Sequence, residues 1–388
     1  MNKLIIAAAG AGKTTYLIQQ ALETNANVLI TTFTIENTEC IRQKFINKIG
    51  YVPNHVTIQT WFSFLIQHGV KPFQGSLRRE LFEKTITGLH FCEQQSGINY
   101  YIRKRNKKIP ILFNENEEFM QHYFDRDMRI FSDKLSKFVC RANNATGGKV
   151  VERIRKIFPN IFIDEVQDLS GYDLALIDLL FRSSANILLV GDPRQTTYLT
   201  HWEKKNQKYH FGKITDFIKN ECRKSDKIII DTTTLNCSHR NNESICNFSS
   251  LLYNEFPVTS ICTCETCHPK HQHEGIYAIQ EKEVYQYIKL YNPTILRYNS
   301  KKEVGESNGI FTFGNSKGRE FNDVLIFPTE KMEKWLVELD NSIFEPTTKA
   351  KFYVAITRAR FSVAFVVSEQ IYDSLKSNLF INTWKNSI

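Results

Sequence analysis

The sequence predicts an α/β protein with two parallel-sheet domains and a mainly helical insertion in the first. Three observations support this prediction. A glycine-rich turn joins a short apolar run to a helical segment at residues 4–22. Further apolar runs alternate with helical segments, as they do in a parallel sheet wound with helices. A charged, aromatic stretch that is poor in strand signal, residues 71–150, interrupts the alternation.

The apolar runs give the positions of the expected strands. In the first domain these runs are Leu4–Ile6, Val28–Thr32, Val56–Gln59, Ile161–Ile163 and Ile187–Val190. In the second domain they are Lys227–Ile230, Gly275–Ile279, Thr294–Arg297, Val324–Phe327 and Val363–Val367. We therefore expect a first domain of residues 1–70 and 151–208, an insertion of residues 71–150, and a second domain of residues 209–388.

Composition argues against membrane proteins and disulfide-rich secreted domains. No apolar run has the length needed to span a bilayer, and Leu4–Ile6 is too short for the core of an export signal. Nine cysteines without an export signal favour the cytoplasm, where they would be free thiols or metal ligands. The net charge of +9 favours a polyanionic partner.

The segment AAAGAGKTT has the pattern of a phosphate-binding loop, with Ala7 in place of the first glycine. Glycines let the backbone wrap round phosphates, Lys13 can reach the β- and γ-phosphates, and Thr14 can hold Mg²⁺. The loop therefore predicts a site for a nucleoside triphosphate with Mg²⁺. Its candidate nucleotide-binding residues are Gly10, Ala11, Gly12, Lys13, Thr14 and Thr15.

The segment IFIDEVQDLS supplies the carboxylates that triphosphate hydrolysis requires. Asp164 ends an expected strand, where it can hold Mg²⁺ through water, and Glu165 can orient and deprotonate the attacking water. The alternative is a helix start with acidic residues in its first turn. Gln195 follows the next strand, where it can sense the γ-phosphate. These polar groups and the glycine loop would meet at one edge of one sheet.

A series of motifs resembles the UvrD/Rep/PcrA-type superfamily 1 DNA helicases. TFTIENTE and QTWFSFL are similar to the family's T-F-T-N-K and T-F-H-S-F segments. DEVQD, GDPRQ-x-x-Y, SHRNNESI, TFGNSKGREF and KFYVAITRAR follow in the family's order, so that the resemblance runs to about Val367. It implies two RecA-like P-loop NTPase domains that hydrolyse ATP with Mg²⁺ between them and act 3′ to 5′ on single-stranded or tailed duplex DNA.

The resemblance also implies roles for residues of the second domain. Arg240 and Arg358 would reach the γ-phosphate as arginine fingers. Glu320 would hold the ribose, with Gly318 two residues before it in the same segment. His239 stands where the family usually has a tyrosine against the adenine.

Single-stranded DNA would be contacted mainly by aromatic residues, because base stacking tolerates any sequence. For Phe33 and Phe62 the alternative is packing in the core. The residues that the resemblance implies are Phe33, Trp61, Phe62, Tyr198, Trp202 and Thr312.

Two departures from the family pattern leave the function open. A short link, Lys301–Asn308, replaces the family's large helical insertion, and no room precedes the loop for the glutamine segment that reads adenine. We therefore expect relaxed base selectivity. We prefer a DNA helicase or translocase; the alternative is an ATP-gated nucleic-acid sensor or regulatory subunit of a nuclease or defence complex, without robust unwinding.

The segment YYIRKRNKKIP is strongly basic and begins with two tyrosines. Arg103, Lys104 and Arg105 in it are candidates for contacts with nucleic-acid phosphates. The alternative is a solvated charged loop.

The segment CTCETCHPKHQH contains sulfur and nitrogen ligands at close spacing. Cys262, Cys264, Cys267 and His271 are candidates for a zinc site, because Cys264 and Cys267 have the C-x-x-C spacing of zinc ligands. The alternative is a polar loop with reduced thiols.

Overall fold

The computed structural model describes residues 2–104, 107–198, 204–223, 225–264, 266–300, 304 and 309–385. Its contacts divide the chain into two units. The first comprises Met1–Leu4, Thr14–Gly191 and Tyr198–Ile230, and the second comprises Ile5–Lys13, Asp192–Thr197 and Asp231–Ile388. The glycine-rich loop and the segment that follows Gly191 are therefore grouped with the second unit.

A six-stranded sheet with the order β10-β1-β9-β8-β2-β3 organises the first part of the chain. β2 pairs in parallel with both β3 and β8, and β8 pairs in parallel with β9. Every residue of β2 and β8 is buried, as expected for interior strands covered on both faces. The strands are β1 (Asn2–Ile6), β2 (Val28–Thr32), β3 (Val56–Thr60), β8 (Asn160–Ile163), β9 (Asn186–Gly191) and β10 (Ile228–Asp231).

Helices connect these strands, and local sequence determines where some of them begin and end. In α2 the Thr34 side chain accepts a hydrogen bond from the backbone N–H of Asn37, and Gly50 ends the helix in the left-handed region. The helices are α1 (Lys13–Leu22), α2 (Ile35–Ile49), α3 (Trp61–Phe64), α5 (Leu135–Ala145), α6 (Lys149–Ile157), α7 (Tyr172–Arg182) and α8 (Ile214–Glu221).

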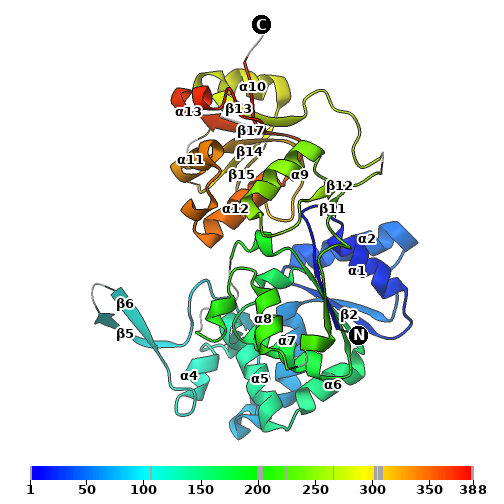
Figure 1. The fold of residues 1–388 in the computed structure, drawn as a ribbon. Helices are drawn as coiled ribbons and strands as arrows, with labels where there is room; N and C mark the ends of the chain where they lie inside the picture. Colours follow the sequence, from blue (N-terminus) through cyan, green and yellow to red (C-terminus); the bar gives the residue numbers. More distant parts are fainter. Residues whose placement is uncertain are drawn as a thin grey trace. The chain divides into compact units, whose positions relative to one another are not determined.

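The segment of residues 71–150 is less helical than expected. Besides α4 (Phe119–Tyr123) and α5, it contains strands β4 (Gly88–His90) and β7 (Arg129–Phe131), which pair in parallel. It also contains an antiparallel hairpin of β5 (Ile98–Lys104) and β6 (Lys107–Leu112), which extends away from the rest of its unit (Figure 1).

Tyrosine and isoleucine favour strands, and they account for this hairpin within a charged sequence. Ile102 lies opposite Ile109, and Tyr101 lies opposite Pro110. A proline is tolerated there because both strands of a two-stranded sheet are edge strands.

The second six-stranded sheet has the order β15-β14-β16-β17-β13-β18, and all its pairings are parallel. Its strands are β13 (Gly275–Gln280), β14 (Thr294–Arg297), β15 (Ile310–Thr312), β16 (Phe321–Phe327), β17 (Ala359–Val367) and β18 (Asn382–Thr383). A separate parallel pair precedes it, β11 (Cys237–Ser238) and β12 (Ser260–Ile261). The helices are α9 (Glu243–Ser250), α10 (Val284–Tyr291), α11 (Glu330–Glu338), α12 (Pro346–Ile356) and α13 (Glu369–Ser374).

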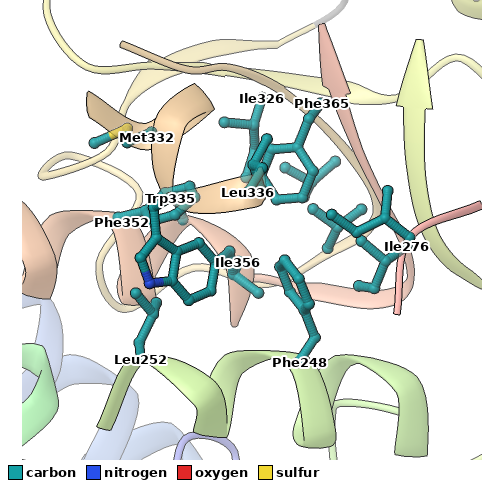
Figure 2. Packing of buried hydrophobic residues seen from close by; sticks show 14 of the residues in the cluster. Phe248, Leu252, Ile276, Ile326, Met332, Trp335, Leu336, Phe352, Ile356 and Phe365 are labelled. Carbon is teal, nitrogen blue, oxygen red and sulfur yellow. The ribbon is translucent and has the colours of Figure 1, made fainter. Parts of the chain in front are cut away.

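Alternating side chains of this sheet build a core on each face. Ile326 and Phe365 lie in the larger cluster, whereas their neighbours Leu325 and Ala364 lie in the smaller one. Figure 2 shows the larger cluster, in which Trp335 lies among side chains from other helices. The larger cluster draws on α9, α11, α12 and α13, and the smaller on α10. Helices therefore cover both faces, as a parallel sheet requires.

The predicted α/β fold class with two parallel sheets is confirmed, and every predicted apolar run overlaps a strand. All nine cysteines are free thiols. In the described part of the chain, no helix combines the length and the apolar character needed to cross a membrane.

Candidate functional site

The glycine-rich loop between β1 and α1 is closely packed around Gly10. Gly10 and Gly12 have φ of 73° and 75°, a region that favours glycine. A Cβ on Gly10 would lie 2.6 Å from Ser238 Oγ and 2.7 Å from Arg240 Cβ. The backbone N–H of His239 donates a hydrogen bond to the Gly10 carbonyl oxygen at 3.0 Å. Glycine is therefore required at position 10 for both conformation and space.

Arg194 holds the start of the loop, a role that the sequence did not predict. Its Nη2 donates to the Ala7 carbonyl oxygen at 3.0 Å, and its Nε donates to Asp192 Oδ1 at 2.7 Å. Burial lowers the pKa of Arg194, but the Asp192 carboxylate outweighs burial and raises it above its ordinary value. Ala8 N–H donates to the Leu235 carbonyl oxygen at 2.7 Å. The place of Arg194 within the GDPRQ motif was the signal that could have indicated its role.

The Thr14 hydroxyl donates a hydrogen bond to Asp164 Oδ2 at 3.3 Å. Thr14 is the second residue of α1, directly after Lys13, and Asp164 follows β8 and is 5% exposed. A hydroxyl beside a carboxylate is a pair of oxygen ligands suited to Mg²⁺. The structure thus brings together two residues that the sequence predicts as metal ligands. Of the other loop residues, Ala11 is buried and Thr15 is exposed.

Glu165 has an unusual backbone conformation beside this pair. Its φ of 53° and ψ of 39° lie in the left-handed region, where residues other than glycine are strained. Its N–H donates to Asp164 Oδ1 at 2.9 Å, and its carboxylate accepts a hydrogen bond from Gln167 Nε2. These bonds hold the half-buried Glu165 carboxylate in place.

Arg358 and Gln195 form a buried pair in the second unit. The Arg358 Nη2 donates to Gln195 Oε1 at 3.2 Å, and Gln195 Nε2 donates to Asp192 Oδ2 at 2.9 Å. Arg358, which is 2% exposed, follows α12 and also donates from Nε to the Val354 carbonyl oxygen at 3.1 Å. The structure thus joins the KFYVAITRAR and GDPRQ motifs through side chains.

Arg240 forms an ion pair with Glu320, with 2.8 Å between Nε and Oε2. Its Nη1 also donates to the Thr357 carbonyl oxygen at 3.3 Å. Arg360 lies 3.6 Å from the other Glu320 oxygen. Gly318 precedes this glutamate in an exposed turn with φ of 83°. The predicted arginine finger and the predicted ribose ligand are therefore in direct contact.

Asn241 fixes the SHRNN segment, and only its place in that motif could have indicated this role. Its side-chain Nδ2 donates to the carbonyl oxygens of Thr357 at 3.1 Å and Ala359 at 2.6 Å. Because Asn241 is 2% exposed, these two bonds are made away from water. The segment that carries His239 and Arg240 is thereby tied to the start of β17.

Phe33, Phe62 and Tyr198 form an aromatic cluster in the first unit. The ring centroids of Phe33 and Phe62 lie 5.0 Å apart, and those of Phe33 and Tyr198 lie 5.3 Å apart. Phe62 is buried, Phe33 is half-buried and Tyr198 is 38% exposed. The Tyr198 hydroxyl donates to Asp168 Oδ2 at 3.0 Å. Two of the three aromatic residues in this cluster, Phe33 and Tyr198, therefore have accessible surface.

Two further predicted DNA contacts form hydrogen bonds within the chain. Trp61 is 1% exposed, and its indole Nε1 donates to Asp173 Oδ1 at 2.7 Å, which places it in the core. Thr312 ends β15 half-buried, and its hydroxyl accepts a hydrogen bond from Asn315 N–H at 3.3 Å. Trp202 lies outside the described residues.

The predicted basic patch lies on the β5–β6 hairpin. Arg103 is opposite Lys108 and Lys104 is opposite Lys107, and all four side chains are exposed. Like charges directly opposite one another destabilise an antiparallel pair. The hairpin therefore carries two pairs of opposed cations, whose mutual repulsion lowers its stability. Arg105 lies outside the described residues.

The predicted zinc ligands are only partly brought together. Cys262 and Cys267 lie in one group with His239, a residue that the sequence had indicated for the adenine instead. The His271 ring stacks on Phe361 with 4.2 Å between centroids, and its Nδ1 accepts a hydrogen bond from His273 N–H at 3.3 Å. His271 is therefore engaged elsewhere.

Residues 78–209 match the family of the UvrD/REP helicase N-terminal domain. This match spans the region that contains Asp164, Glu165 and Gln195. The resemblance to UvrD/Rep-type superfamily 1 helicases that the motifs predicted is thereby confirmed. No curated relative matches the chain.

Among solved structures, the chain is similar to viral helicases at low sequence identity. The crystal structure of arterivirus nonstructural protein 10 (helicase) is 13% identical, with 97% of this chain and 62% of that chain covered and a TM-score of 0.45. Its complex with DNA is 13% identical, with 97% of this chain and 63% of that chain covered and a TM-score of 0.44. The PRRSV helicase is 14% identical, with 94% of this chain and 52% of that chain covered and a TM-score of 0.42. The chain spans less than two thirds of the length of each of these proteins.

Proposed function

We propose that this chain is an ATP-dependent motor that binds single-stranded DNA and moves along it from 3′ to 5′. The observation that carries this proposal is the hydrogen bond between Thr14 and Asp164. It joins two motifs that are 150 residues apart in the sequence, as a site that hydrolyses nucleoside triphosphates requires. The match of residues 78–209 to a helicase N-terminal domain supports nucleic acid as the polymer along which the motor moves.

In the proposed site, the glycine loop binds the triphosphate through its backbone and Lys13 contacts the β- and γ-phosphates. Thr14 and Asp164 would hold Mg²⁺, whose charge would offset that of the phosphates. Their hydroxyl and carboxylate oxygens are the ligand type that Mg²⁺ prefers, so the residues present fit this ion. Glu165 would accept a proton from the attacking water, and its constrained backbone would hold its carboxylate in position.

Arg358 and Arg240 would stabilise the negative charge that develops on the phosphates. Arg358 is buried and bonded to Gln195, so its guanidinium needs little reorganisation to act. Arg240 pairs with Glu320 and lies beside Gly10 of the loop. A bound triphosphate would compete with Glu320 for this guanidinium, which would free the carboxylate to accept a hydrogen bond from the ribose.

The proposed DNA contacts are of two kinds. Phe33 and Tyr198 would stack on unpaired bases, because each has accessible ring surface. The cations of the β5–β6 hairpin would contact backbone phosphates, and a polyanion would relieve the repulsion between its opposed charges. Thr312 stays a proposed contact of the second unit.

A translocation assay on labelled single strands tests the motor directly. We expect ATP-dependent arrival at the 5′ end, and weak separation of a 3′-tailed duplex by the isolated chain. Glu165→Gln is the matched control, because it should bind the strand without moving. DNA-stimulated ATP turnover without any movement would contradict the motor and favour an ATP-gated sensor that acts through a nuclease or another partner.

A further inference from the structure

Three metal-binding side chains gather at the loop that follows β12. One ligand atom from each of His239, Cys262 and Cys267 lies within 4.8 Å of the other two. Cys267 Sγ is 3.5 Å from His239 Nδ1. In a tetrahedral zinc site, bond lengths of about 2.3 Å to sulfur and about 2.0 Å to nitrogen place two such atoms about 3.5 Å apart. This observed distance fits a shared zinc ion.

The pairing of β11 with β12 fixes two of these residues side by side. Ser238, the last residue of β11, lies opposite Ile261, the last residue of β12. Cys262 N–H then donates to the Ser238 carbonyl oxygen at 3.0 Å. His239 directly follows β11, and Cys262 directly follows β12. The register of the two strands therefore brings these two side chains close together. Residues 23 positions apart in the numbering of the sequence thus become neighbours.

A short turn carries Cys267, the third member of this group, together with Cys264. Cys267 N–H donates to the Cys264 carbonyl oxygen at 3.1 Å, which closes the C-x-x-C segment, and Arg360 Nη2 donates to the Cys267 carbonyl oxygen at 3.3 Å. The Cys264 Sγ lies 2.9 Å from Thr266 Oγ1 within the same turn. Cys264 is exposed and lies on the same turn, so it can complete a set of four.

We propose that His239, Cys262, Cys264 and Cys267 bind one structural Zn²⁺ ion. Three thiolates and one imidazole form a common zinc site, whereas Mg²⁺ and Ca²⁺ prefer oxygen ligands. Four protein ligands leave no open position, so the ion serves structure and not chemistry. This inference goes beyond the proposed motor function and does not rest on it.

Zinc at this site would stabilise the segment that packs against the glycine loop. His239 N–H donates to the Gly10 carbonyl oxygen, and the neighbouring Arg240 packs its Cβ against Gly10. A metal ligated by the His239 ring would restrict both contacts. The His239 ring would then be engaged by the metal and not free to stack on a nucleotide base.

Metal analysis of the purified full chain tests this proposal. We expect about one zinc per chain, and a large loss of bound zinc in His239→Ala, Cys262→Ser and Cys267→Ser. Cobalt substituted for zinc in the unaltered chain should give the intense visible absorption of a tetrahedral site and a thiolate charge-transfer band. This spectrum does not depend on any variant, so it tests the proposal even where a variant fails to fold.

Two matched controls separate this site from the alternatives. His271→Ala and Cys40→Ser should keep stoichiometric zinc, because the first ring stacks on Phe361 and the second thiol is exposed on α2. Cys264→Ser should weaken zinc binding by more than about tenfold. A chain that binds no zinc, a loss with His271→Ala but not with His239→Ala, or unchanged affinity in Cys264→Ser would overturn the four-ligand site.

Discussion

The glycine loop and the β5–β6 hairpin are both proposed to contact phosphates, and the chain builds them in opposite ways. Around the loop, Arg194 is 2% exposed and is bonded to both a carboxylate and a loop carbonyl. On the hairpin, Arg103 and Lys104 are exposed and face other cations. The loop must hold its charged groups at fixed positions around one phosphate group, and buried hydrogen bonds provide this rigidity. A surface that binds the backbone of a nucleic acid needs positive charge but no such fixed geometry.

This contrast predicts different consequences for substitutions in the two regions. Changes around the loop should act on ATP turnover and depend little on salt, because buried charges are weakly screened. Changes on the hairpin should act on DNA affinity and its salt dependence, and should leave basal turnover intact. Four sets of substitutions test the contrast, in order of decreasing effect.

The largest effects are expected at the phosphate loop and at the proposed base. Lys13→Ala should abolish triphosphate binding, while Glu165→Gln should retain binding and lose turnover by several orders of magnitude. Nucleotide binding and steady-state turnover, measured side by side, separate the two roles. Glu23→Gln, an exposed carboxylate near the end of α1, is the matched control and should hydrolyse ATP normally. If Glu165→Gln hydrolysed ATP at the rate of the unaltered chain, Glu165 would not be the general base.

A loss of turnover of about a thousandfold is expected for Arg358→Ala, the usual effect of removing such an arginine. Arg358→Lys keeps the charge but cannot reproduce the guanidinium bonds to Gln195 and to the Arg319 carbonyl oxygen, so it should recover little of the rate. Because Arg358 is buried, thermal unfolding of each variant must accompany the kinetics. A folded Arg358→Ala chain with near-normal turnover would contradict the assignment.

Intermediate effects are expected in the aromatic cluster. Phe33→Ala should weaken binding of single-stranded DNA by about 1–3 kcal/mol, the value of one stacked base. Phe33→Tyr retains the ring and serves as the control, with affinity close to that of the parent. The measurement is a titration of a labelled strand at fixed salt. Equal affinities in Phe33→Ala and the parent would mean that this ring only packs against Phe62.

The hairpin should give the smallest change at a single salt concentration but the clearest salt signature. Replacing Arg103, Lys104, Lys107 and Lys108 by glutamine should flatten the slope of log affinity against log salt. The expected change is about 0.7 for each phosphate of a single strand that these cations neutralise in the parent. Basal ATP turnover should not change, since these residues are exposed on a separate hairpin. If the slope for this variant equalled that of the unaltered chain, the hairpin cations would be solvated and would not contact DNA phosphates.

The sequence predicted the sheets well because buried parallel strands are nearly continuous apolar runs. Val28–Thr32 and Thr294–Arg297 were predicted with the bounds that β2 and β14 have. The contact between Thr14 and Asp164 was also expected, because strand ends of one sheet meet at one edge. The predicted domain limits at residues 70, 150 and 208, like the roles of the site residues, stay predictions.

Long-range partners account for what the sequence did not predict. Trp61 lies in the core, where Asp173, 112 residues away, accepts its indole N–H, and nothing near Trp61 in the sequence indicates this partner. His239 joins Cys262 and Cys267 through the register of β11 and β12, which spacing along the chain does not encode. The hairpin was missed because its charges hid the strand preference of its tyrosines and isoleucines.

ATP turnover measured with no nucleic acid, with single-stranded DNA, with blunt duplex and with RNA tests whether a single strand of DNA drives this motor. We expect single-stranded DNA to stimulate turnover far more than blunt duplex, because stacking on Phe33 and Tyr198 requires exposed base faces. Glu165→Gln should abolish turnover under every condition. Turnover that is the same with and without single-stranded DNA would contradict a motor driven along a strand.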